Sequence, residues 1–142
     1  MRRALVLSGG GCKGAFEAGA IDYLVNEAGK DFKIFMGTSV GALNAALLSQ
    51  ARNQRELRQL TGDLKALWLE IKTNSAIYDQ DWLRMVNLLC GRPALYRPKG
   101  LRRLLQERID LQRVFDPVTV LKVTTVALET GKLCYADSRR PE

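Results

Sequence analysis

The sequence contains no histidine, and this absence excludes one large class of catalytic sites. A Ser-His-Asp triad needs an imidazole to take the proton of the serine hydroxyl, so none can be built from these 142 residues. Histidine is also the commonest metal ligand, and the cysteines show no Cys-x-x-Cys spacing. We therefore expect no metal site and no resident cofactor.

Cysteine is scarce, with only Cys12, Cys90 and Cys134. An odd, scattered set does not form a disulfide framework and is typical of a reducing compartment. No apolar run approaches the roughly 20 residues of a membrane-spanning helix. The apolar run that follows Arg3 stops after four residues at Ser8, which is too short for a signal peptide. These features predict a cytoplasmic protein and are compatible with peripheral contact with a membrane.

Aromatic residues make up only 7% of the chain and do not alternate with the basic residues, so we expect no nucleic-acid partner. The net charge of +7 has two interpretations: attraction to anionic membrane surfaces, or arginines on solvated helix faces. The second is favoured. The length predicts one domain over residues 1–142 with a single core, and nothing indicates an oligomeric state.

The sequence is organised around Ser39, which lies between Gly37 and Gly41. A short apolar run precedes this segment and an alanine-rich helical pattern follows it. That order is typical of a nucleophile elbow, a sharp strand-to-helix turn that exposes a serine hydroxyl at a helix N-terminus. Side chains at either glycine would collide with neighbouring backbone, and Thr38 and Val40 complete the turn.

A glycine-rich segment, Gly9–Gly14, joins a predicted strand over residues 4–7 to a predicted helix over residues 15–28. A phosphate-binding loop would need a Ser or Thr after Lys13, and Gly14 stands there. The dinucleotide pattern matches formally at Gly9, Gly11 and Gly14, but no acidic residue ends a clear second strand. A plain glycine turn is also possible.

An oxyanion hole is the favoured interpretation of this segment, because the serine elbow follows one helix later. Its donors would be backbone N–H groups within Gly9, Gly10, Gly11, Cys12, Lys13 and Gly14. Strands over residues 4–7 and 32–36 should pair in parallel through a right-handed crossover. Both loops would then meet at the carboxyl ends of the strands.

The two motifs together resemble the N-terminal signature of the patatin-like phospholipases, in order and in spacing, over roughly the first fifty residues. They read Gly-Gly-Gly-Cys-Lys-Gly-Ala at residues 9–15 and Gly-Thr-Ser-Val-Gly-Ala-Leu-Asn-Ala at residues 37–45. The resemblance implies a three-layer α/β/α fold with a mainly parallel sheet. It also implies hydrolysis of lipid or phospholipid esters by a Ser-Asp dyad, with Ser39 as nucleophile, Gly9–Gly14 as oxyanion hole and Lys13 at the family's basic position.

One departure from the family concerns the dyad aspartate, which lies in an Asp-Gly turn that this sequence lacks. Asp116 and Asp137 are the nearest candidates, and we interpret both as structural. The chain is therefore expected to hold the N-terminal part of the fold, C-terminally incomplete, and to be inactive for want of a base. A non-catalytic lipid- or partner-binding fragment is the alternative, and an acyltransferase using the same serine is a third option.

Apolar residues at helical spacing predict three helices in the middle of the chain, and core packing is favoured over a lipid-binding cleft for all of them. The first runs from Leu57 to Ile71 with a kink or break at residues 61–63, the second from Trp82 to Gly91, and the third from Leu101 to Ile109. Residues 92–100 are predicted as a loop. Strands over residues 118–127 and 132–136 form a predicted hairpin with Gly131 in its turn.

Overall fold

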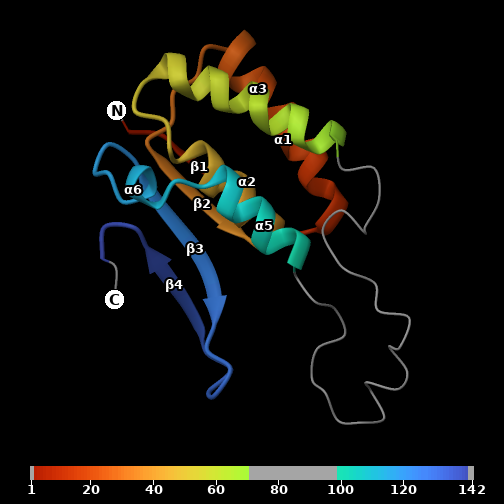
Figure 1. Cartoon of the computed structure of the whole chain (residues 1–142). Coiled ribbons are helices and arrows are strands. Elements are labelled where there is room, and N and C mark those ends of the chain that lie inside the picture. The colour runs from red at the N-terminus through yellow and green to blue at the C-terminus, as the bar shows by residue number, and fades with distance from the viewer. Residues whose placement is uncertain (1, 71–98, 141–142) are drawn as a thin grey trace. The chain divides into compact units, whose positions relative to one another are not determined.

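The computed structural model describes residues 2–70 and 99–140 (Figure 1). The chain divides into two compact units, of which the larger comprises Met1–Trp68 with Ile109–Glu142 and the smaller Leu69–Arg108. The helix expected over residues 82–91, most of the loop expected over residues 92–100 and Cys90 lie outside the described residues. The smaller unit contains helix α5 (Lys99–Arg108), which matches the third helix expected from the sequence but begins earlier, within the expected loop, at Lys99.

A four-stranded sheet forms the centre of the larger unit, with strand order β1-β2-β3-β4 (Figure 1). Its strands are β1 (Ala4–Leu7), β2 (Ile34–Thr38), β3 (Val120–Val126) and β4 (Leu133–Asp137). The first three run parallel, and β4 pairs antiparallel with β3. The expected α/β class and mainly parallel sheet are confirmed, as is the hairpin, where Gly131 adopts a φ of 66°.

Helices connect the strands and supply most of the remaining core. They are η1 (Gly11–Lys13), α1 (Gly14–Asp22), η2 (Tyr23–Glu27), α2 (Val40–Leu48), α3 (Gln54–Glu70) and α6 (Leu111–Val114). One core cluster joins buried sheet residues such as Phe35 and Leu121 to buried helix residues such as Ile21, Leu48 and Leu64. Successive right-handed crossovers between neighbouring parallel strands place their helices on one face of the sheet, which explains the single cluster.

The opposite face of the sheet is exposed in the described part of this unit. Strand register places Val6, Val126, Leu133 and Tyr135 on that face, and each is more than half exposed. Side chains alternate between the two faces of a strand, so these residues cannot join the core beneath the helices. A second helical layer, expected from the three-layer architecture, is not among the described residues of this unit.

Helix α3 corrects one expectation, because it runs unbroken through Thr61, Gly62 and Asp63. Thr61 is fully buried, and its hydroxyl donates to the Leu57 carbonyl oxygen at 2.7 Å within the helix. Gly62 faces open space, where it costs the helix only about 1 kcal/mol relative to alanine. Burial of the apolar face on the core outweighs that weak local preference for a break.

Candidate active site

Ser39 lies at the turn between β2 and α2, with backbone angles φ 54° and ψ −122°. Among the described residues it is the one non-glycine residue with positive φ. Such a conformation costs on the order of 1–3 kcal/mol and persists only where its surroundings impose it. The Ser39 side chain is exposed and makes no capping bond to α2, so its hydroxyl faces solvent at the helix N-terminus.

Two glycines make this turn sterically possible. A Cβ atom at Gly37 would lie 2.2 Å from the carbonyl oxygen of Gly41. A Cβ atom at Gly41 would lie 2.5 Å from the carbonyl oxygen of Ser8, the residue between β1 and the glycine-rich segment. Backbone therefore packs directly on backbone here, which fixes the start of α2 against both β2 and the chain leaving β1.

The glycine-rich segment adjoins Ser39. A Cβ atom at Gly9 would lie 3.2 Å from the Cβ atom of Ser39. Gly11 has a φ of 58°, which glycine adopts without strain, and η1 then leads into α1. Gly9, Gly10, Gly11, Cys12 and Lys13 are exposed beside the turn, whereas Gly14 is buried.

The elbow lies at the positive end of α2. The first N–H groups of a helix have no partner within it, and the helix dipole adds a partial positive charge there. The earliest helical bonds of α2 run from the Ala42 and Leu43 amides to the Ser39 carbonyl oxygen. The N–H groups that precede them, at Val40 and Gly41, therefore lie at the end of α2 that favours negative charge.

The two aspartates nearest to the C-terminus are both engaged in ion pairs. Asp116 pairs with Arg52 at 3.1 Å, and Asp137 pairs with Arg139 at 2.8 Å and Lys122 at 3.3 Å. Asp137 lies on β4, two strands from β2, which corresponds to about 10 Å across the sheet. That separation exceeds hydrogen-bond reach to Ser39, so the sheet does not bring Asp137 to the elbow.

The ion pairs of Asp137 with Arg139 and Lys122 predict that part of the chain's stability depends on pH. Hydrogen bonds from Arg139, with further help from Lys122, hold the pKa of the Asp137 carboxyl well below its usual range. A depressed folded-state pKa contributes stability that is full above the unfolded pKa of about 3.9 and disappears as pH falls through the folded pKa. We expect Asp137→Asn to lower the melting temperature at pH 7, and the difference from wild type to shrink below about pH 3.9.

The control for this measurement is Glu129→Gln, which changes an exposed carboxylate in the turn between β3 and β4. It should leave the melting temperature nearly unchanged at each pH. A difference for Asp137→Asn that stays constant from pH 7 to pH 2.5 would contradict an electrostatic origin. Added salt should reduce the difference at pH 7, because these ion pairs lie at the surface.

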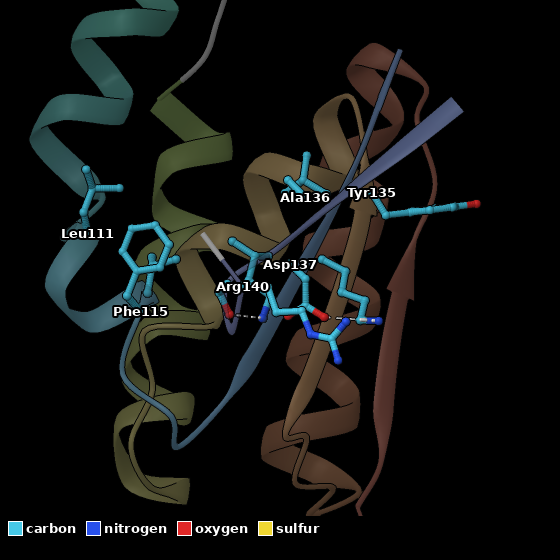
Figure 2. A pocket seen from close by; sticks show the side chains of 11 residues that line it. Leu111, Phe115, Tyr135, Ala136, Asp137 and Arg140 are labelled. Atoms are coloured by element: carbon cyan, nitrogen blue, oxygen red, sulfur yellow. Dashed lines mark hydrogen bonds and ion pairs between the residues drawn. The ribbon is translucent and has the colours of Figure 1, made fainter. Parts of the chain in front are cut away.

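A groove of about 650 Å³ lies between α6 and the β3–β4 hairpin (Figure 2). Leu111 and Phe115 form one wall, and Ala136, Asp137 and Arg140 lie along the other. The Tyr135 ring points away from Leu111 and Phe115 in Figure 2. The residues lining this groove include none from the glycine-rich segment or the elbow, so it is separate from the candidate active site.

Within the described ranges, no three potential metal-ligating side chains gather into a site, and no helix has the length and apolarity needed to cross a membrane.

A sequence model of one family, described as Patatin-like phospholipase, matches residues 5–138. No curated protein matches the chain. No solved structure matches it either.

Proposed function

Because the chain belongs to the patatin-like phospholipase family, we propose that it carries the nucleophile and oxyanion hole of a lipid acyl hydrolase. The observation that carries the proposal is the backbone of Ser39, strained at positive φ and held beside the glycine-rich segment. Strain of this kind gathers at functional sites, and nothing in the local packing of an ordinary turn requires it. Serine between glycines at a strand-to-helix turn is the arrangement of acyl-transfer nucleophiles.

The proposed reaction has two steps. In the first, the Ser39 Oγ attacks the ester carbonyl carbon, a base takes its proton, and the alcohol leaves with a proton. In the second, water attacks the acyl-serine and releases the fatty acid. Amides of the glycine-rich segment and the start of α2 hold the oxyanion in both steps.

The base is the missing part of this proposal. The family resemblance assigns it to an aspartate in an Asp-Gly turn, and this sequence has no Asp followed by Gly. Asp116 and Asp137 are held in ion pairs with arginines, which supports a structural role for both. We propose that the 142 residues bind and position an ester but turn it over very slowly.

The experiment that tests the proposal is covalent labelling by a fluorophosphonate, which reports a reactive serine without needing the second step. We expect slow modification at Ser39 and nowhere else. A chain that takes up no label, or takes it up at another residue, would overturn the proposed nucleophile.

A lipid- or partner-binding role without catalysis is the alternative function, and two exposed apolar side chains favour a lipid surface. Phe16 follows the glycine-rich segment and is 81% exposed, and Leu128 in the hairpin turn is 98% exposed. Because β2 and β3 run parallel, that turn lies at the same sheet edge as Ser39. Lys13, which is exposed three residues before Phe16, supplies a positive charge.

Vesicle binding tests this alternative. We expect the chain to co-sediment with anionic vesicles more than with neutral ones, and the excess to fall at high salt because exposed charges are screened. Phe16→Ala should weaken binding, whereas Leu111→Ala, which trims an exposed leucine on α6, should not. Equal sedimentation with both vesicle types at both salts would remove the electrostatic contribution.

A further inference from the structure

A polar network lies directly behind the glycine-rich segment. The Glu17 carboxylate on α1 accepts two hydrogen bonds from Ser8: from the backbone N–H at 2.9 Å and from the hydroxyl at 3.3 Å. Ser8 immediately precedes Gly9, so these bonds fix the point at which the chain leaves β1. Both reach Oε1, which leaves the second carboxylate oxygen for another donor.

That donor comes from α2. The Asn44 side-chain amide donates to Glu17 Oε2 at 3.1 Å and to the Gly14 carbonyl oxygen at 3.3 Å. Its own oxygen accepts from the Trp68 indole N–H at 3.0 Å, on α3. Asn44 is only 2% exposed, so water cannot take the place of any of these partners, and loss of one would leave a buried polar group without a hydrogen bond.

The same network holds the far end of the segment. A Cβ atom at Gly14 would lie 2.4 Å from the Trp68 ring and 2.6 Å from Val40, the first residue of α2. Asn44 bonds the Gly14 carbonyl oxygen, and Glu17 bonds Ser8. Both ends of the glycine-rich segment are therefore tied, directly or through Glu17, to one buried asparagine on the helix that follows Ser39.

We propose that Glu17, oriented by Asn44 and Trp68, is a positioning residue that holds the glycine-rich segment in register with Ser39. The inference rests on the proposed function, because register matters only if the segment supplies oxyanion donors. A carboxylate suits this place because it is acceptor-only and faces three donors: the Ser8 N–H, the Ser8 hydroxyl and the Asn44 amide. Its charge also makes these bonds stronger than neutral ones.

Glutamine at position 17 cannot reproduce the network. If its oxygen accepts from Ser8, its NH2 group faces the Asn44 NH2 group. If it turns round, the NH2 group faces the Ser8 N–H instead. Rotating Asn44 does not help, because its NH2 group would then face the Trp68 N–H. In every arrangement one donor is left without an acceptor. The free energy lost with that hydrogen bond weakens the attachment of the glycine-rich segment to α1 and α2.

The experiment compares Glu17→Gln with wild type by two measurements on the full chain. Amide hydrogen exchange of Ser8 and Gly9 reports how firmly the backbone is held at the start of the glycine-rich segment, and it does not depend on whether Ser39 reacts. The rate of fluorophosphonate labelling at Ser39 reports the register. We expect faster exchange and roughly tenfold slower labelling, since small misplacements of catalytic donors cost one to two powers of ten.

A control and a rescue separate positioning from stability. Asp22→Asn breaks a contact of α1 with Lys65 on α3, without touching the glycine-rich segment. It should change thermal stability but neither the exchange of Ser8 nor the labelling rate. In Glu17→Gln/Asn44→Asp, the glutamine NH2 group can donate to the new carboxylate, which still accepts from Trp68 but has no donor for the Gly14 carbonyl oxygen. This pair should recover the slow exchange of Ser8, whose two donors again face an acceptor, and only part of the labelling rate.

The outcomes distinguish this inference from the proposed function. Unchanged exchange of Ser8 and Gly9 in a folded Glu17→Gln variant would overturn the positioning role, whatever the labelling. Faster exchange with unchanged labelling would overturn the link to Ser39 while leaving the nucleophile in place. A wild-type chain that takes up no label would overturn the proposed function, and faster exchange alone would then show that Glu17 orders the segment for some other purpose.

Discussion

Ser39→Ala is expected to abolish labelling by a fluorophosphonate. In this reaction the Ser39 Oγ forms a bond to phosphorus, the phosphorus–fluorine bond breaks, fluoride leaves and the hydroxyl proton passes to water. The phosphoryl oxygen occupies the place of an ester oxyanion, so the nearby amides favour reaction at this serine over others. The variant removes one exposed oxygen and no packed atom, so the fold should survive while the label disappears.

The measurement is intact-mass analysis over hours, followed by peptide mapping of the modified residue. Thr130→Ala is the matched control, because it removes an exposed hydroxyl in the turn between β3 and β4, outside the strands that pair with β2. It should label at the wild-type rate. Label that persists in Ser39→Ala, with the same yield, would show that another side chain reacts and that the strained turn has a different purpose.

The same two proteins report on the base. Removing one member of a catalytic pair costs several powers of ten in rate. Hydrolysis of a soluble chromogenic ester by the 142-residue chain is therefore expected to match the Ser39→Ala background. Turnover well above that background, lost in the variant, would show that a base exists within these residues, and Asp116 and Asp137 would be the first to replace.

The strands and the elbow could be predicted because their determinants are local. Apolar runs bounded by glycines identify β1 and the approach to β2, and the Gly-x-Ser-x-Gly pattern gives the turn into α2 at the residue where it occurs. Glycine and β-branched residues also predict the hairpin of β3 and β4. Each of these signals lies within about ten residues of chain, so a single sequence is enough to read it.

Other features depend on where distant elements meet. Trp68 belongs to an apolar stripe in the sequence, yet its N–H bonds Asn44, twenty-four residues away along the chain. Glu17 lies within the helix expected over residues 15–28, and it gains its donors only where α1 meets Ser8 after β1 and Asn44 on α2. Helix α6 is four residues long, and its sole local signal is Asp110, whose side chain caps it by accepting from the Gln112 amide.

Continuity of α3 shows why local signals also mislead. A glycine next to a threonine suggests a break, but each costs the helix only a few tenths to about 1 kcal/mol. Burial of Leu57 and Leu64, both 1% exposed, contributes about 1.5–3 kcal/mol each and decides the outcome. The glycines of the elbow differ from Gly62 in this respect, because their role is set by close backbone contacts and not by helix preference.

Gly41→Ala is expected to destabilise the fold strongly, although it adds a single methyl group. The new Cβ atom would lie 2.5 Å from the Ser8 carbonyl oxygen and 2.6 Å from that of Leu7, both backbone atoms that cannot rotate away. Overpacking usually costs about 1–3 kcal/mol and more when backbone must move. We expect a loss of at least about 3 kcal/mol in the free energy of unfolding, against total stabilities near 5–15 kcal/mol, measured by urea denaturation.

Gly62→Ala supplies the matched control, since it adds the same methyl group to a glycine with nothing within 4 Å. There alanine should raise the free energy of unfolding by about 0.5–1 kcal/mol, through helix propensity and a less flexible unfolded chain. If the same added methyl group lowers the free energy of unfolding at position 41 and raises it at position 62, the destabilisation arises from the contact between α2 and the chain at the end of β1. If Gly41→Ala folded as stably as wild type, the chain leaving β1 could not lie against the start of α2, and the register between the glycine-rich segment and Ser39 would be lost with that contact.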